Sequence, residues 1–279
     1  MMKKILIPID FSPAARYGFE YAEWLSLPFH TDIKALHVAT PPQYEETLSA
    51  SFIEQFKQDK KAAIERHLKR FTTPYPDHQD EALTRIKNLA CETHFGEIVP
   101  EILRASEAME ADLIVIGTRK KHNIWDHLFG SVTTQLIEKS TVPILVIPEG
   151  CAFQAIKQIA FATAITGNEP PILNYLADLA KQLDAEIKQV YVNTMPYDLF
   201  DNKEEVWELS SSTVMKQKVN MVREPNVEKG LDFFVEKHSI DLLAMMIPKR
   251  SKLEQYWHKS NTKKMAYKSH LPLLLIPES

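Results

Sequence analysis

The sequence predicts an α/β protein built from two tandem, doubly wound sheets of the Rossmann-like type, each with five parallel strands. Three observations indicate this fold. Short apolar runs alternate with longer amphipathic stretches, the two halves of the chain repeat one another, and 44% hydrophobic with 25% charged residues is an ordinary globular composition. The 279 residues are enough for two domains, which are predicted at residues 1–150 and 151–279.

In the first half, five short apolar runs are expected to form strands and four amphipathic stretches to form helices. The strands are expected at 5–9, 33–38, 86–93, 113–116 and 144–147, and the helices at 13–26, 52–70, 98–110 and 131–139. Pro13 suits the first turn of a helix. Because right-handed crossovers cover both faces of such a sheet, a ligand is expected at the carboxyl ends of the strands, near the loops after the first and fourth strands.

The repeat is visible as a constant offset at each end of the two halves. Residues 3–12 align with 157–166 at an offset of 154, and residues 143–149 align with 272–278 at an offset of 129. The difference of 25 residues indicates a deletion in the second half, between its second and third strands. Two homologous domains explain this pattern.

Charge and cysteine content exclude several classes of function. A formal net charge of −4 gives no overall field to hold a polyanion, so nucleic-acid binding is not expected. Two cysteines are too few for a disulfide framework and suit a reducing compartment. No stretch without Asp, Glu, Lys or Arg exceeds 11 residues, and Asp10 interrupts the first apolar run before it reaches signal-peptide length. We expect no membrane span and a cytoplasmic location.

The two loops at the expected ligand edge carry the candidate binding residues. Asp10 follows the first strand, whereas the loop after the fourth strand contains Gly117, Thr118, Arg119, Lys120, Gly130 and Ser131. Only 7 of the 279 residues are glycine, so Gly117 and Gly130 indicate positions where a Cβ is excluded. Free N–H groups at the helix start after Gly130 would attract an anion. The alternative is that Ser131 is simply a helix N-cap.

Asp10 has two interpretations. Its carboxylate would repel a phosphate, but it could accept hydrogen bonds from ribose hydroxyls or from an adenine amine. The alternative is structural, an N-cap in the turn before Pro13.

Several segments together resemble the universal stress protein family. They are residues 5–12, 35–38, 112–119, 130–132 and 142–148. The nucleotide-binding branch of that family has Gly, two residues, Gly, nine residues, Gly and then Ser or Thr. Here this frame falls on Gly117, Lys120, Gly130 and Ser131, with lysine in place of the middle glycine. The chain is therefore similar to a tandem member of the family.

The resemblance implies that the first domain binds an adenine nucleotide, ATP, with or without magnesium. Asp10 and the backbone of Val38 would hold the ribose and adenine, and Pro8 and Ile9 would lie beneath them. The phosphates would be surrounded by Gly117, Arg119, Gly130, Ser131, Val132 and Thr133. Lys120 would either contact a phosphate directly or fill the space that the backbone needs to approach one.

The second domain lacks most of these residues. Asp10, Gly117 and Gly130 are replaced by Ala164, Met246 and Lys259, respectively, and Lys120 is matched by Lys249. Of the residues that fit the family pattern, only Ser131 keeps its counterpart, Ser260. We expect the second domain to have lost nucleotide binding.

No residue is assigned to catalysis or to a metal. Cys91 and His94 lie three apart in a predicted strand, so their side chains would point to opposite faces. No nucleophile elbow, phosphate-binding Lys-Ser/Thr loop or paired-carboxylate motif is present.

The last strand of each domain, at 143–147 and 272–276, is almost wholly apolar and would lie at a sheet edge. The resemblance implies that subunits of the family join through this strand. Here the two copies are expected to pair with each other within one chain, and a homodimer of whole chains stays open.

The predicted function is that of a stress-response protein that binds ATP in domain one and transmits occupancy through the contact between the domains. One alternative is a nucleotide-free interaction or dimerisation scaffold in which Lys120 abolishes binding. Another is a slow ATP hydrolase, which the lack of a metal-holding carboxylate beyond Asp10 disfavours.

Overall fold

The structure, a computed structural model, describes residues 2–27, 31–41, 49–73, 88–119, 131–165, 169–195, 204–210, 216–247 and 271–278. The strands of the first half are β1 (Lys4–Pro8), β2 (Asp32–Ala39), β3 (Leu89–Phe95), β4 (Leu113–Thr118) and β5 (Ile144–Pro148). Its helices are α1 (Pro13–Ser26), α2 (Ala50–Phe71), α3 (Ile98–Ala108) and α4 (Ser131–Lys139). The second half contains β6 (Gln158–Ala162), α5 (Pro170–Leu183), β7 (Glu186–Asn193), β8 (Glu204–Ser210), β9 (Lys216–Arg223), α6 (Val227–Lys237), β10 (Leu242–Ile247) and β11 (Leu273–Pro277).

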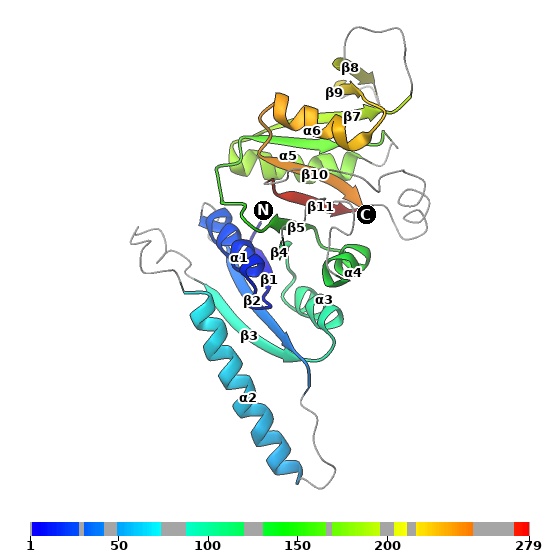
Figure 1. The fold of residues 1–279 in the computed structure, drawn as a ribbon. Coiled ribbons are helices and arrows are strands. Elements are labelled where there is room, and N and C mark those ends of the chain that lie inside the picture. The colour runs from blue at the N-terminus through cyan, green and yellow to red at the C-terminus, as the bar shows by residue number, and fades with distance from the viewer. Residues whose placement is uncertain are drawn as a thin grey trace.

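These strands form one continuous sheet in the order β3-β2-β1-β4-β5-β11-β10-β6-β7-β9-β8 (Figure 1). The α/β class is confirmed, and so is the expected pairing of the last strands of the two halves within one chain, which joins the strands of both halves into one sheet. The edge strands β5 and β11 pair antiparallel, with Leu145 opposite Leu274. Pairing removes two apolar edges from solvent, which is the physical reason for the single sheet.

The second half differs from the predicted five parallel strands by one added strand. β8 runs antiparallel to β9 at the far edge of the sheet. In the chain it follows β7, at the position where the first half has the long helix α2 between β2 and β3. Antiparallel neighbours need only a short connection, whereas parallel strands need a crossover of about a dozen residues or more. The deletion in the second half thus coincides with the loss of a crossover helix.

The two halves repeat the same local contacts at the offsets that the sequence shows. Asp112 Oδ2 accepts hydrogen bonds from the amides of Lys3 and Lys4, and Asp241 Oδ2 does the same for Lys157 and Gln158. Non-glycine residues with positive φ also recur in pairs, at Phe11 and Ile165 and at Glu110 and Ser239. The internal repeat therefore extends to backbone geometry. The division at residue 150 stays a prediction.

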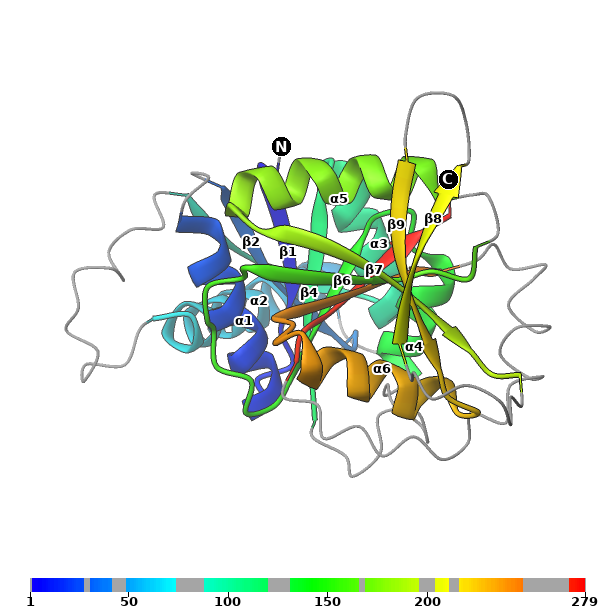
Figure 2. The same ribbon diagram turned by 90° about the horizontal axis from the view of Figure 1, so that it is seen from above.

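Helices cover both faces of the sheet. One buried cluster joins the sheet to α1, α2 and α5, and another joins its opposite face to α3, α4 and α6. Figure 2 shows α5 and α6 on opposite sides of the second-half strands. Each cluster takes residues from both halves of the chain, so the core crosses the β5–β11 pairing.

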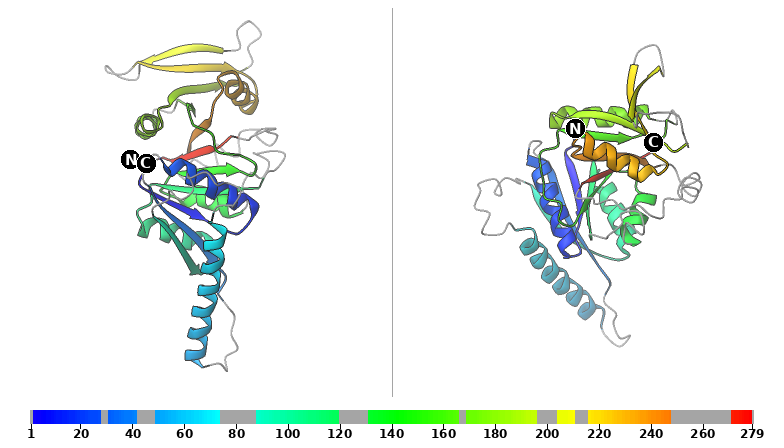
Figure 3. Two further views of the ribbon diagram at one scale, coloured as in Figure 1. Left: turned by 90° about the vertical axis from the view of Figure 1, so that its left-hand side faces the viewer. Right: turned by 45° about the horizontal axis from the view of Figure 1, so that its top comes forward.

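Helix α2 is the exception to this packing. Leu68 is its only residue that is fully buried, and its N-terminal part carries the exposed rings of Phe52 and Phe56. Figure 3 shows α2 extending away from the rest of the molecule. Its C-terminal end is docked on the body beside the β1–α1 loop, and Lys60 in its middle lies over the Phe95 ring of β3.

Candidate functional site

A pocket of about 390 Å³ lies at the carboxyl ends of β1, β2 and β4. The crossover from β1 leads to β2 on one side, while β4 pairs with β1 on the other, so the pocket occupies the topological switch point. The structure brings nine of the eleven predicted site residues to its wall: Pro8, Ile9, Asp10, Val38, Gly117, Arg119, Ser131, Val132 and Thr133. The other two, Lys120 and Gly130, lie outside the described residues.

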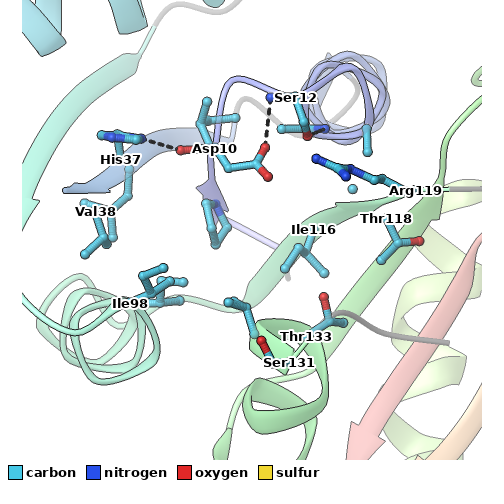
Figure 4. Close-up of a pocket in the computed structure, with 18 residues that line it drawn as sticks. Asp10, Ser12, His37, Val38, Ile98, Ile116, Thr118, Arg119, Ser131 and Thr133 are labelled. Atoms are coloured by element: carbon cyan, nitrogen blue, oxygen red, sulfur yellow. Dashed lines mark hydrogen bonds between the residues drawn. The ribbon is translucent and has the colours of Figure 1, made fainter. Parts of the chain in front are cut away.

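The loop between β1 and α1 presents Asp10 at the pocket. Asp10 Oδ1 accepts a hydrogen bond from the amide of Ser12 at 2.9 Å, and the side chain is otherwise exposed (Figure 4). Ser12, not Asp10, is the N-cap of α1, since its Oγ accepts from the amide of Ala15 at 3.2 Å. The alternative interpretation of Asp10 as the helix cap is therefore wrong. Asp10 keeps Oδ2 available for a ligand hydroxyl.

Gly117 excludes a Cβ for a reason other than the expected one. A Cβ built there would lie 1.8 Å from the carbonyl oxygen of Ala14 and 2.9 Å from the amide nitrogen of Ala15. The glycine lets the first turn of α1 pack on the end of β4. Gly117 therefore shapes the pocket by allowing α1 to form one of its walls, to which Ala14 and Ala15 contribute.

The N-terminus of α4 borders the pocket on the β4 side. Ser131 is the first residue of the helix and is exposed, while Thr133 is buried. The first amides of a helix lack intrahelical partners, so this end carries free donors and a partial positive charge. Arg119 is exposed at the end of β4 and also lines the pocket (Figure 4). The α4 N-terminus and Arg119 are the two anion-favouring groups of the pocket wall.

Strand β2 contributes backbone groups on the remaining side. Leu36 O accepts from the amide of Ile9 at 2.8 Å, while Ala39 O accepts from Gly96 on the β3 side at 3.1 Å. Because backbone polar groups alternate along a strand, the N–H and C=O of Val38 point to the β1 side, past the last β1 partner, Pro8. Val38 therefore presents one donor and one acceptor where β1 has ended.

Sequence reasoning missed several residues of the wall. They are Ser12, Ala14, Ala15, Leu36, His37, Ile98, Ile102, Ile116 and Thr118. Ile98 and Ile102 are four apart on α3 and could have been found from helical spacing. His37 gave no such signal, because its position depends on a tertiary contact. Its Nδ1–H donates to Ile9 O at 2.7 Å, since a carbonyl can only accept.

The equivalent place in the second half carries different side chains. Ile9 and Ala15 line the first pocket, and their counterparts Thr163 and Glu169 are joined by a hydrogen bond of 3.0 Å from the hydroxyl to Oε1. Glu169 is buried, and Met246, at the position of Gly117, packs against the core. A buried carboxylate would repel a phosphate there. The counterparts of Lys120, Gly130 and Ser131, which are Lys249, Lys259 and Ser260, lie outside the described residues.

Two further properties were searched for in the described part of the chain. It contains no group of three or more His, Cys, Asp or Glu side chains arranged to hold a metal ion. It also contains no helix that is both long and apolar enough to span a membrane.

Comparison with known proteins agrees with this architecture. The sequence model of the universal stress protein family matches residues 1–148. Universal stress protein MJ0577 of Methanocaldococcus jannaschii is 25% identical over 157 residues, covering 53% of this chain and 95% of that protein. MJ0531 of the same organism is 28% identical over 155 residues, covering 53% and 82%. A universal stress protein from Archaeoglobus fulgidus matches the fold with a TM-score of 0.68 at 14% identity, covering 100% of this chain and 97% of that one. Because the family match takes in more than half of the chain, the chain belongs to the universal stress protein family.

Proposed function

We propose that this protein binds one adenine nucleotide, ATP, in the pocket of its first half and acts as a nucleotide-dependent regulator in the stress response. The observation that carries the proposal is the set of polar and charged groups that line one pocket. The pocket wall combines an exposed carboxylate and a strand end with a helix N-terminus and an arginine. A nucleotide needs this combination, because its sugar donates hydrogen bonds while its phosphates carry negative charge.

Each group has a role in this arrangement. Asp10 accepts from the ribose hydroxyls, the N–H and C=O of Val38 meet the polar edge of adenine, and Ile98, Ile102 and Ile116 form the apolar wall against the base. The amides at Ser131 and the guanidinium of Arg119 bind phosphate oxygens. In the second half, Ala164 replaces the acceptor and the buried carboxylate of Glu169 stands at the position of Ala15, so one nucleotide per chain is proposed.

The first experiment is extraction and titration. Nucleotide released by denaturing the purified protein is identified by liquid chromatography, and the stripped protein is titrated with ATP, with and without magnesium, by calorimetry. We expect binding at one site per chain, and Asp10→Ala weakens it about tenfold or more because hydrogen bonds to a charged group are lost. Thr163→Ala, at the pocket-equivalent position of the second half, is the matched control and leaves the affinity unchanged.

A nucleotide-free scaffold is the competing function, and the same experiment decides between them. If no nucleotide is released and none binds up to millimolar concentration, the ATP proposal is wrong and the scaffold replaces it. The cytoplasmic location, the homodimer and slow ATP hydrolysis stay predictions.

A further inference from the structure

An aromatic cluster connects the pocket loop to the projecting helix. We call it the aromatic clamp, and it consists of Phe11, His37, His67 and Phe71. The ring of Phe11 stacks on that of His67 with centroids 4.3 Å apart and planes 8° apart. It also meets His37 at 4.5 Å and the edge of Phe71 at 5.6 Å. His67 and Phe71 belong to the last two turns of α2, which is how this helix end is held.

A second tie joins the same two elements. Arg16, in the first turns of α1, donates from its guanidinium to the carbonyl oxygen of Phe71, and to that of Thr73 at 3.1 Å. These carbonyls belong to the C-terminal end of α2, where a cation is favoured. The guanidinium also lies over the Phe71 ring, 5.9 Å from its centroid. The clamp and Arg16 thus fix α2 to the segment from Phe11 to Arg16.

That segment is also a wall of the pocket. Phe11 lies between the lining residues Asp10 and Ser12, while its own ring contacts α2 and is not part of the wall. Its backbone has a φ of 61°, which is costly for a bulky residue. His37 belongs to both sets, since it lines the pocket, touches Phe11 and donates to the carbonyl of Ile9. Movement of the α2 end would therefore act directly on the residues proposed to hold the ribose.

The second half shows that the turn itself does not need the clamp. Ile165, the counterpart of Phe11, keeps a φ of 52° and is 42% exposed. The crossover there is a strand instead of a helix, and the pocket acceptor is absent because Ala164 replaces Asp10. The clamp and the acceptor Asp10 thus occur together in one half, whereas the other half has Ala164 and Ile165 in place of Asp10 and Phe11.

We propose that docking of the C-terminal end of α2 through the aromatic clamp regulates ligand binding in the pocket, and that the ligand in turn holds α2 docked. This inference rests on the proposed function, since it concerns the same site. The state with α2 docked holds the loop from Asp10 to Ser12 in its binding geometry. Because coupling between two sites is reciprocal, a nucleotide that prefers this state must also stabilise the docked helix. The element that responds to the nucleotide is then α2, with its exposed N-terminal part.

Hydrogen exchange of the full chain tests this coupling in the unmodified protein. If undocking of α2 abolishes binding, ATP at ten times its dissociation constant slows exchange of the amides of α2 residues 66–71 by about tenfold. Amides of β1 report global unfolding in the same sample. The slowing must appear in α2 amides that exchange faster than those of β1, which identifies local opening.

Two double variants distinguish the effect of losing the aromatic clamp from the effect of any change in α2. His67→Ala with Phe71→Ala removes both α2 rings from Phe11 without touching the pocket wall. We expect it to bind ATP about threefold or more weakly and to lose the ATP-dependent protection of α2. Phe52→Ala with Phe56→Ala removes two rings from the other end of the same helix and is the matched control, with unchanged affinity and unchanged protection. Circular dichroism checks that each variant is folded, and the single exposed His67→Ala change serves if the double variant is not.

The outcomes distinguish the two proposals. If the unmodified protein binds ATP but α2 exchange does not respond and the clamp variant binds equally well, the coupling is wrong and the nucleotide site stands. If the unmodified protein binds no ATP, both proposals are wrong.

Discussion

Gly117 lies where α1 and β4 come closest, and its missing side chain allows that contact. Its counterpart in the second half is Met246, where α5 begins only at Pro170 and not at the position aligned with Pro13. A glycine at this end of β4 is therefore explained by the packing of a helix that forms one wall of the pocket. The family motif and the packing requirement coincide at this one residue.

The first prediction concerns this contact. Gly117→Ala places a Cβ 1.8 Å from the carbonyl oxygen of Ala14, which is backbone and cannot rotate away. We expect the free energy of unfolding to fall by about 2–3 kcal/mol, since overpacking forces the helix to move. Urea denaturation measures the change, with Thr118→Ala as the neighbouring control. A Gly117→Ala variant as stable as the parent would mean that α1 shifts without cost.

The second prediction concerns the pH dependence of stability. Glu23 on α1 is buried, and burial raises its pKa to about 7, with Arg16 opposing and Glu20 adding to the shift. The folded state therefore holds the proton more tightly than the unfolded state, whose pKa is 4.5. This favours folding below pH 4.5 and is lost as the pH rises through 7, by on the order of 2–3 kcal/mol.

Glu23→Gln tests that assignment. The variant is expected to gain stability relative to the parent above pH 7 and to show a flatter stability profile between pH 4.5 and 7. Denaturant unfolding at several pH values measures this. Some slope will remain, because burial also raises the pKa of Asp232 on α6 to about 6. A profile identical to that of the parent would show that Glu23 is ionised in the folded protein.

At the scale of elements, the pocket results from strands of unequal length. β1 ends at Pro8 opposite Leu36, whereas β2 continues to Ala39. The connections from β1 to β2 and from β4 to β5 leave the space beyond the end of β1 open. The base in the proposed complex meets the overhanging part of β2. An adenine edge offers an acceptor and a donor, which match the N–H and C=O of Val38.

This geometry predicts base selectivity. Guanine presents a donor and an acceptor in the reverse arrangement, so its edge would leave the Val38 groups unpaired. We expect GTP to bind about tenfold or more weakly than ATP, as measured by competition titration with the two triphosphates. Since Val38 acts through its backbone, Val38→Ala keeps the preference while losing some apolar contact. Equal affinities for ATP and GTP would show that the base does not meet the β2 overhang.

The elements also show what sequence patterns could and could not predict. The strands of the first half and its four helices follow from hydrophobic periodicity, and the ligand edge follows from their order. β8 was not predicted, because it lies in the segment where the deletion makes the second half differ from the first, and no strand of the first half corresponds to it. His37 and the clamp were missed for a related reason. Contacts between residues as far apart as Phe11 and His67 depend on how a helix end docks, and neither residue marks this in its local sequence.

For the whole molecule, the question is whether the predicted domains 1–150 and 151–279 are independent folding units. Leu145 and Leu274 face each other across the antiparallel pairing of β5 and β11, and both are almost fully buried. Tyr21 and Tyr175 occupy equivalent positions on α1 and α5, and the pKa of each is affected by an aspartate of the other half. The pKa of Tyr21 is raised by burial, by Cys151 and by Asp241, and that of Tyr175 by burial and by Asp112. The halves thus share one buried core across the strand pair, to which α1 and α5 both contribute.

This shared core predicts cooperative unfolding of the full chain. Leu145→Ala removes a buried side chain at the pairing of the halves and is expected to cost about 2–5 kcal/mol. Differential scanning calorimetry should show one transition for the parent and one transition at lower temperature for the variant, because neither half can lose its edge partner and keep its core. Leu103→Ala, on α3 in the first half and away from the β5–β11 pairing, is a control for loss of a leucine elsewhere. Two separate transitions, with only the first-half transition shifted by Leu145→Ala, would instead show that the halves fold independently and that the strand pairing is a weak contact between finished domains.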